Sequence, residues 1–350
     1  MCTINPNLIN MPEVVINEIL EKLDLRNIIT LRKVCKSLLS FIDSQNSLPE
    51  LIDLSIFVNF EKIEVWYYHK NGLNVVGYCS QNNRNDTKLV FSNLEENSKI
   101  LKNQNYFTSF LTDFKFFISR QNFQILRQFR LTRYECEETG STVFLKIFED
   151  ISKILKSKPR PLSVEELLIG VVDDSELIKI LEFLNSKNLK SIKISSNSLK
   201  NQSINSEEIE KLDQWKSAKN LSIDNFILEI SLEKLLHFSF LDVKLEIVDA
   251  RNLLDLKNKF LESTDPKEFV FTFVGMKNQE KILEFFGTPE ILKNIFGQES
   301  QRWKLQYPGN EKILEIQICK NWCKFTNIES LEEQVRRRRE EAEQLENSGN

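Results

Sequence analysis

The chain has 350 residues, of which 41% are hydrophobic and 28% are charged, and its formal net charge is −4 at pH 7. The length suits about two domains of ~150 residues each, and the composition is that of a globular protein. The acidic balance argues against a general nucleic-acid-binding surface, and only 9 glycines argue against glycine-rich, phosphate-binding loops.

The sequence indicates neither a targeting segment nor a membrane span. Its first residues, MCTINPNLIN, lack a basic segment followed by an apolar core, and no stretch approaches ~18 uninterrupted apolar residues. The six cysteines are scattered along the chain, which is typical of reduced thiols. We therefore expect a cytoplasmic or nuclear protein, or one found in both compartments, without a membrane partner.

Residues 11–43, MPEVVINEILEKLDLRNIITLRKVCKSLLSFID, predict two or three short helices. Pro12 suits a first helical turn, and Asp24 can cap a second helix. Apolar residues then recur at helical spacing on more than one side of the segment. About 35 residues cannot bury that much apolar surface alone. The helices must therefore dock either on the rest of the chain or on another protein, and the residues alone do not decide between the two.

This segment resembles an F-box. The resemblance rests on Pro12, the Ile19-Leu20-x-x-Leu23 step, Asp24, Leu31, Val34-Cys35-Lys36 and Leu38. Met11 and Leu38 depart from the commonest pattern, which has Leu and Trp there, but both are apolar replacements. The resemblance implies a helical module that binds the Skp-type adaptor of a cullin–RING ubiquitin ligase. The adaptor-binding residues expected from it are Pro12, Ile16, Ile19, Leu20, Leu31, Val34, Cys35 and Leu38.

The middle of the chain, residues 46–160, combines β-type and Phe-rich helical segments. Two strand-like runs in residues 64–78 flank Asn71-Gly72, a strong hairpin signal, and residues 88–91 offer a third strand. Residues 106–117 place Phe107, Phe110, Leu111, Phe114 and Phe117 on one helical stripe, which we interpret as core packing. Residues 141–157 predict another amphipathic helix, and KPRP at 158–161 marks a boundary.

From residue 162 onward, strand-like and helix-like segments alternate. The predicted strands are residues 164–172, 189–195, 220–223, 243–248 and 268–274, and the predicted helices are 175–186, 206–219, 231–238 and 249–262. Strand centres recur roughly every 23–30 residues, close to the ~20–29 of leucine-rich repeats. We therefore predict parallel strands with right-handed crossovers, in an irregular leucine-rich-repeat-like arc that binds proteins.

The same region resembles the FTH domain, which follows the F-box in a large nematode family (F-box A type). The residues that carry this resemblance are Gln214, Trp215, Lys216, Ala218, Leu221, His237 and Phe238. The resemblance implies that the region binds target proteins. By their types and spacing, however, the residues are mostly structural. Trp215 suits an interior anchor, Gln214 a hydrogen bond to a neighbouring backbone turn, and His237 a structural role.

The residues give little support for catalysis or metal binding. The only histidines, His69 and His237, lie in different segments, and Cys319 and Cys323 lack the further ligands that a closed zinc site needs. Cys35 lies between Lys33 and Lys36, which could activate a thiol, but we place it on a helix beside Leu31, Leu38 and Leu39. We expect no cofactor and no metal, and a chain that is not an enzyme.

The tail, residues 330–346, contains a basic run of Arg336 to Arg339. Acidic residues four positions away on both sides predict an exposed, salt-bridged helix rather than a nucleic-acid site. The last residues, ENSGN, are expected to fray.

The sequence thus predicts an α+β or α/β repeat protein in four parts. They are an F-box (residues 1–45), a linking β-hairpin and Phe-rich helical region (46–160), an FTH or leucine-rich-like region (161–328) and a charged helix with a frayed tail (329–350). We expect the substrate-recognition subunit of a Skp–cullin–F-box ubiquitin ligase, with an unidentified target protein. The alternative is an interaction scaffold that acts without the ligase.

Overall fold

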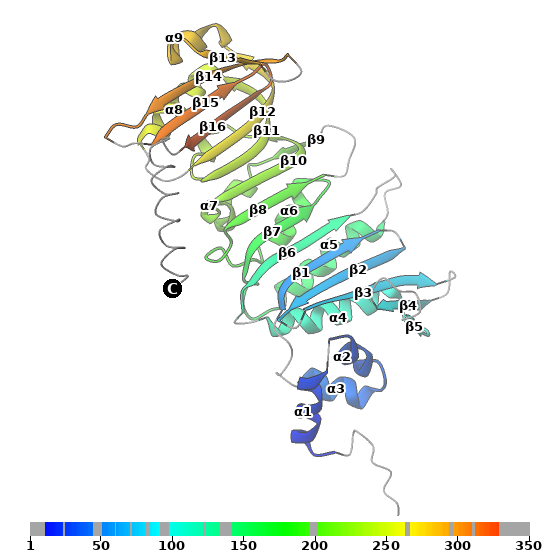
Figure 1. Cartoon of the computed structure of the whole chain (residues 1–350). Coiled ribbons are helices and arrows are strands. Elements are labelled where there is room, and N and C mark those ends of the chain that lie inside the picture. The colour runs from blue at the N-terminus through cyan, green and yellow to red at the C-terminus, as the bar shows by residue number, and fades with distance from the viewer. Residues whose placement is uncertain are drawn as a thin grey trace, which may run out of the picture. The chain divides into compact units, whose positions relative to one another are not determined.

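The computed structural model describes residues 11–23, 25–44, 51–59, 61–70, 72–81, 85–91, 98–121, 124–133, 142–196, 202–262, 267–293, 297–309 and 312–328 (Figure 1). The chain divides into two compact units. Unit 1 comprises Met1–Lys190 and Leu212–Ser217, and unit 2 comprises Ser191–Lys211 and Ala218–Asn350. The expected cap Asp24, the turn residue Asn71 and the tail lie outside the described residues.

Unit 1 begins with three short helices: α1 (Glu13–Lys22), α2 (Leu25–Arg32) and α3 (Lys36–Ser44). Pro12 precedes α1, and its carbonyl accepts the N–H groups of Val15 (2.9 Å) and Ile16 (3.2 Å). The helical rhythm predicted across Val34 and Cys35 is wrong in one respect, because a turn separates α2 from α3. The Cys35 carbonyl accepts the Leu39 N–H at 3.0 Å, so Cys35 directly precedes α3 rather than lying inside a helix.

The sheet of unit 1 has the order β7-β6-β1-β2-β3-β4-β5. Its strands are β1 (Leu51–Val58), β2 (Lys62–His69), β3 (Gly72–Gln81), β4 (Asp86–Phe91), β5 (Ser98–Leu101), β6 (Leu126–Arg133) and β7 (Val164–Gly170). β1 to β5 form an antiparallel meander, whereas β6 runs parallel to both β1 and β7. The predicted hairpin is confirmed: His69 pairs with Gly72, whose φ of 124° suits glycine in a tight turn.

Helices α4 (Tyr106–Arg120), α5 (Thr142–Lys156) and α6 (Asp174–Leu181) belong to unit 1, and both of the helices predicted between residues 46 and 160 are present. The Asn105 side chain caps α4 by accepting the Phe107 and Thr108 N–H groups. The predicted Phe stripe of α4 is buried against the sheet: Phe117 contacts Tyr67 at 4.7 Å and Phe110 contacts Tyr78 at 5.9 Å between ring centroids. Leu111 is half-buried.

Unit 2 is built on parallel strands with helical segments between them. Its parallel strands are β8 (Ser191–Ser195), β9 (Gln202–Asn205), β10 (Asn220–Glu229), β11 (Phe240–Asp249) and β12 (Glu268–Lys277). β10 pairs with β8, β9 and β11, and β11 pairs with β12. Between these strands the chain forms turns of 3-10 helix at Ile209–Lys211 and Leu232–Leu235 and helix α8 (Ala250–Glu262), while α7 (Asp213–Ser217) belongs to unit 1. All five strands predicted after residue 162 are present. The pairing of β8, β10, β11 and β12 is parallel, as expected.

The repeat pattern ends after β12. The remaining strands, β13 (Glu290–Lys293), β14 (Glu299–Gln306), β15 (Ile313–Ile318) and β16 (Trp322–Ile328), form an antiparallel meander, with a 3-10 turn at Gln279–Lys281 and helix α9 (Ile282–Phe286) before it. β16 pairs antiparallel with β12. The molecule therefore combines N-terminal helices with strand-rich mixed sheets, and a leucine-rich-repeat-like arc stays a prediction.

Candidate functional site

The structure divides the predicted adaptor-binding residues by exposure. Ile16 (4% exposed), Leu20 (2%) and Leu38 (6%) are buried within unit 1, so they support the helices from inside. Val34 is 58% exposed, in the turn between α2 and α3. Pro12 is also exposed, whereas Ile19, Leu31 and Cys35 are half-buried.

Two exposed apolar residues of α1 were not predicted. Val14 is 70% exposed and Val15 is 42% exposed. Both lie outside the buried stripe that contains Ile16 and Leu20. Apolar residues outside the buried stripe of an amphipathic helix are the sequence feature that could have identified them. Val14 and Val15 therefore add exposed apolar surface to α1 outside the stripe that is packed within unit 1.

The inner side of the helices is packed within unit 1. Leu25, Ile28, Ile29 and Ile42 are all 0% exposed. Arg26 lies over the Phe91 ring of β4, with its guanidinium carbon 5.1 Å from the ring centroid. The question left open by the sequence thus has a partial answer: the helices dock on the rest of the chain through one side and leave another side uncovered.

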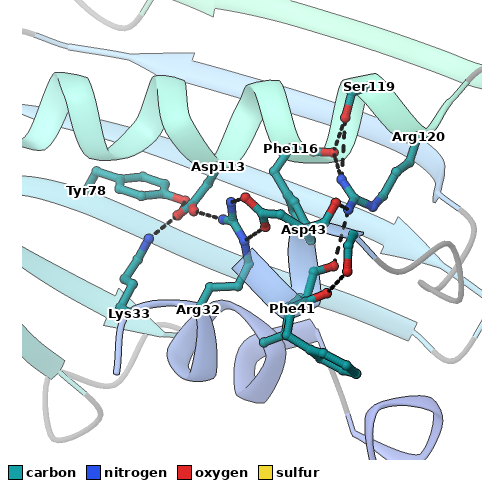
Figure 2. A network of polar contacts seen from close by, with 11 residues as sticks. Arg32, Lys33, Phe41, Asp43, Tyr78, Asp113, Phe116, Ser119 and Arg120 are labelled. Carbon is teal, nitrogen blue, oxygen red and sulfur yellow. Dashed lines mark hydrogen bonds and ion pairs between the residues drawn. The ribbon is translucent and has the colours of Figure 1, made fainter. Parts of the chain in front are cut away.

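A buried ionic network joins the helices to α4 (Figure 2). Asp113, which is 0% exposed, forms ion pairs with Arg32 and with Lys33, the latter at 2.5 Å between Nζ and Oδ2. The Tyr78 hydroxyl donates to the same carboxylate at 2.8 Å. Arg32 Nε donates to Asp43 Oδ1 at 2.8 Å. Asp113 therefore joins two cations of the α2 end to a helix about 80 residues further along the chain.

A second set of contacts holds the end of α3. Arg120 Nη2 donates to the carbonyl oxygens of Asp43 (2.6 Å) and Ile42 (3.2 Å). The Phe116 ring lies between two guanidinium groups, at 3.7 Å from Arg32 and 3.9 Å from Arg120. Charge-assisted hydrogen bonds and cation–π contacts are stronger in a desolvated site than in water, so this junction is well defined.

The tyrosine of the network stays neutral. Burial raises the pKa of Tyr78 well above its ordinary value, and the Asp113 carboxylate raises that pKa further. Tyr78 is therefore a hydrogen-bond donor to Asp113 and not an acid of use near neutral pH.

A cavity of about 550 Å³ lies beside this network, between the α2–α3 turn and α4. Lys33, Cys35, Thr108 and Asp113 are among the residues that line it. Because Lys33 is paired with Asp113, its charge is already engaged. Three cysteines outside this cavity are protected by burial, which raises the pKa of Cys79, Cys319 and Cys323 above its ordinary value.

Cys319 and Cys323 do not share a helix. They flank the turn from β15 to β16, where Ile318 pairs with Cys323. Within the described ranges, no group of three or more His, Cys, Asp or Glu side chains is arranged to hold a metal ion. Nor does any helix of that part of the chain combine the length and apolar character needed to cross a membrane.

The residues that carry the FTH resemblance are mostly buried. Trp215 (1% exposed), Ala218, Leu221 and Phe238 (all 0%) are core residues. Gln214 Nε2 donates to the Leu184 carbonyl at 2.7 Å, which is the backbone contact expected of it. His237 is exposed, with its ring Nδ1 3.1 Å from the Lys234 carbonyl, and Lys216 is also exposed.

Comparison with protein-family models matches residues 8–50 to the F-box domain and residues 145–290 to the FTH domain. Comparison with curated proteins and with solved structures finds no match. The two matched domains occur in the order expected from the sequence. The chain therefore contains an F-box domain followed by an FTH domain.

Proposed function

We propose that this protein is the substrate receptor of a Skp–cullin–F-box ubiquitin ligase. The observation that carries the proposal is that the F-box is buried on one side and exposes apolar residues on another. Its inner side is packed on unit 1, while Val14 and Val34 remain exposed at 70% and 58%. An F-box domain supports adaptor binding, and these residues are the apolar surface available for it.

The proposed adaptor-binding surface combines predicted and newly found residues: Pro12, Val14, Val15 and Val34, with Ile19, Leu31 and Cys35 at its edge. Burying an apolar side chain of this size contributes about 1.5–3 kcal/mol, whereas association costs about 4–15 kcal/mol. Five or six such residues contribute about 8–18 kcal/mol in all, which is comparable to that cost. Ile16, Leu20 and Leu38 contribute by holding the helices in place.

The proposed mechanism involves no covalent chemistry in this chain. The adaptor connects the F-box to a cullin in the cytoplasm or nucleus, and a target protein binds the C-terminal region, on an arc like that of leucine-rich repeats. The receptor raises the effective concentration of the target near the ubiquitin-carrying enzyme.

Substitution of Val34 by Asp tests this proposal. An aspartate at the centre of an apolar interface leaves a desolvated charge, so we expect Val34→Asp to weaken binding to a purified Skp-type adaptor at least about tenfold. The matched control is Val274→Asp, because Val274 is 66% exposed but lies on β12. Adaptor binding that is absent from the wild-type chain, or equal in all three proteins, would contradict the proposal.

The second candidate is an interaction protein that acts without the ligase. The observation that favours it is the buried network of Asp113, Arg32 and Lys33, because it makes the F-box a packed part of unit 1. The same binding experiment separates the candidates, since this second function requires no adaptor.

A further inference from the structure

The strands of unit 1 present two different faces. Along β2, Ile63, Val65 and Tyr67 are 0% exposed, and Tyr67 packs against α4. The alternate residues Glu64, Trp66 and Tyr68 point to the opposite, outward face and are half-buried. An outward sheet face is ordinarily polar, so Trp and Tyr at these positions need an explanation.

The strand register brings an arginine next to these aromatic residues. Ser55 of β1 is opposite both Trp66 of β2 and Arg130 of β6, and Arg130 is opposite Leu168 of β7. The Phe57 and Trp66 rings contact each other edge to face, with centroids 5.0 Å apart. The Arg130 guanidinium carbon is 5.9 Å from the Phe57 ring centroid. We call Phe57, Trp66, Tyr68, Arg130 and Leu168 the outer face of unit 1.

The acidic residues around this face already have partners. Arg127 binds Asp53, Lys62 binds Glu64, and Gln128 Nε2 donates to Glu166 Oε2 at 2.8 Å. Arg130 differs from them, because among the described residues it forms no hydrogen bond and no ion pair, and its Nε is buried. A desolvated guanidinium N–H without an acceptor is costly, and a carboxylate is the acceptor that fits its geometry best.

We propose that the outer face of unit 1 docks a target segment that places a carboxylate on Arg130 and an apolar side chain against Trp66 and Tyr68. The proposal rests on the proposed receptor function and adds to the C-terminal region a second target-binding surface, N-terminal to the FTH match, with a stated chemistry. Trp, Tyr and Arg are the residues enriched at the energetic centres of protein interfaces. Except for Leu168, the whole face lies between the two family matches, in residues that neither domain covers.

A protein segment fits this surface better than a nucleic acid. The outer face carries a single unpaired cation, and the chain has a net charge of −4, whereas nucleic-acid sites neutralise many phosphates. In this arrangement the guanidinium orients the carboxylate, and the aromatic side chains supply the apolar contact area.

The test uses the full chain and synthetic 12-residue peptides. Each peptide carries one Asp or Glu between two residues chosen from Leu, Phe and Trp, and has matched versions with Asn or Gln and with Lys. Binding is measured by fluorescence polarisation. We expect the best carboxylate peptides to bind at least about tenfold more tightly than their amide versions. Binding that does not discriminate between the versions, or no binding in the whole set, would overturn the inference.

The variants locate the site. Arg130→Met keeps the aliphatic stem and should abolish the carboxylate preference, Arg130→Lys should retain part of it, and Arg130→Glu should shift the preference to the Lys peptides. Arg251→Met, on the exposed side of α8, is the matched control and should behave as the wild type. A preference that survives both Arg130→Met and Trp66→Leu would refute this location.

Adaptor binding is measured on the same preparations. A chain that binds the adaptor but shows no carboxylate preference refutes this inference alone. A chain that shows the preference without adaptor binding refutes the receptor function alone. Preferential binding of a 12-nucleotide single-stranded RNA over all peptides would replace the protein partner with a nucleic acid and overturn the inference.

Discussion

At the scale of single residues, Asp113 decides how the F-box is attached. Its carboxylate is fully buried and pairs with both Arg32 and Lys33, whose side chains are 1% and 9% exposed. Asp43 supplies a second negative charge at Arg32. Removing one partner of a buried ion pair leaves an uncompensated charge, which costs far more than the intact pair contributes. The stability of the F-box junction therefore depends more on Asp113 than on any single apolar contact.

Asp113→Asn tests this dependence. We expect a loss of about 3–5 kcal/mol in the free energy of unfolding of unit 1, measured by urea titration, because Lys33 would be buried without a counter-charge. The control is Asp43→Asn, since the Asp43 side chain is 39% exposed and water can replace its contact with Arg32. Equal losses for the two variants would show that burial does not set the cost.

Lys158 predicts a pH dependence. Burial lowers the pKa of Lys158 from 10.5 to about 8, while its Nζ donates to the Ile118 carbonyl at 2.5 Å. Between these two pKa values the unfolded chain binds more protons than the folded chain, so the contribution of Lys158 to stability rises with pH in that window and is lost as pH falls through about 8.

We therefore expect the urea midpoint of the wild type to rise relative to that of Lys158→Met as the pH increases from 8 to 10.5. A difference between the two midpoints that stays constant or shrinks over this window would contradict the assignment.

At the scale of elements, one side of α4 packs on the sheet and another side contacts the F-box. Phe110, Phe114 and Phe117 pack towards the sheet, and Asp113, Phe116 and Arg120 hold the F-box. The sequence predicted the first side because it follows a regular helical stripe. It did not predict the second, because the partners of Asp113 and Phe116 are far away in the chain.

Phe116→Ala should loosen the F-box selectively. Phe116 is 4% exposed and contacts both Arg32 and Arg120, so its loss should cost about 3–5 kcal/mol locally. We expect faster hydrogen exchange in α2 and α3 than in β2, compared with the wild type. Lys115→Ala, an exposed position on the same helix, should leave both rates unchanged. Equal acceleration in α3 and β2 would mean that α4 supports both as one block.

At the scale of the whole molecule, the two units do not follow one another simply along the chain. Residues Leu212–Ser217, which include Gln214 and Trp215, return to unit 1 after the chain has entered unit 2. Gln214 and Ser217 then bind the carbonyls of Leu184 and Ser186. The FTH match at residues 145–290 accordingly contributes to both units.

The packing of unit 1 predicts that the F-box does not fold by itself. Leu25, Ile28, Ile29 and Ile42 are fully buried in the whole chain, and a segment of this size cannot bury them alone. Residues 1–50 as a peptide should lack a cooperative thermal transition by circular dichroism. Residues 51–350 should bind more of an apolar dye than the full chain does. A cooperative transition in the isolated peptide would show that the F-box is autonomous.

The sequence by itself determined the local elements and the two domains. The helices of residues 11–44, the Asn71-Gly72 hairpin, the Phe stripe and the strands after residue 162 follow from periodicity and turn chemistry, which act between residues close in sequence. The F-box match rests on such a local pattern as well. The turn before α3 was missed, because the apolar spacing continues through Cys35 although the helix does not.

Only the tertiary structure decided which of these residues face outward. Periodicity shows that a residue has an apolar side but not what covers it, so buried Ile16 and exposed Val34 looked alike in the sequence. The pairing of Asp113 with Arg32, the contact of Arg130 with Phe57 and the antiparallel pairing of β16 with β12 all join distant segments. Such contacts depend on how the elements pack in three dimensions, which the order of residues along one strand or helix does not specify.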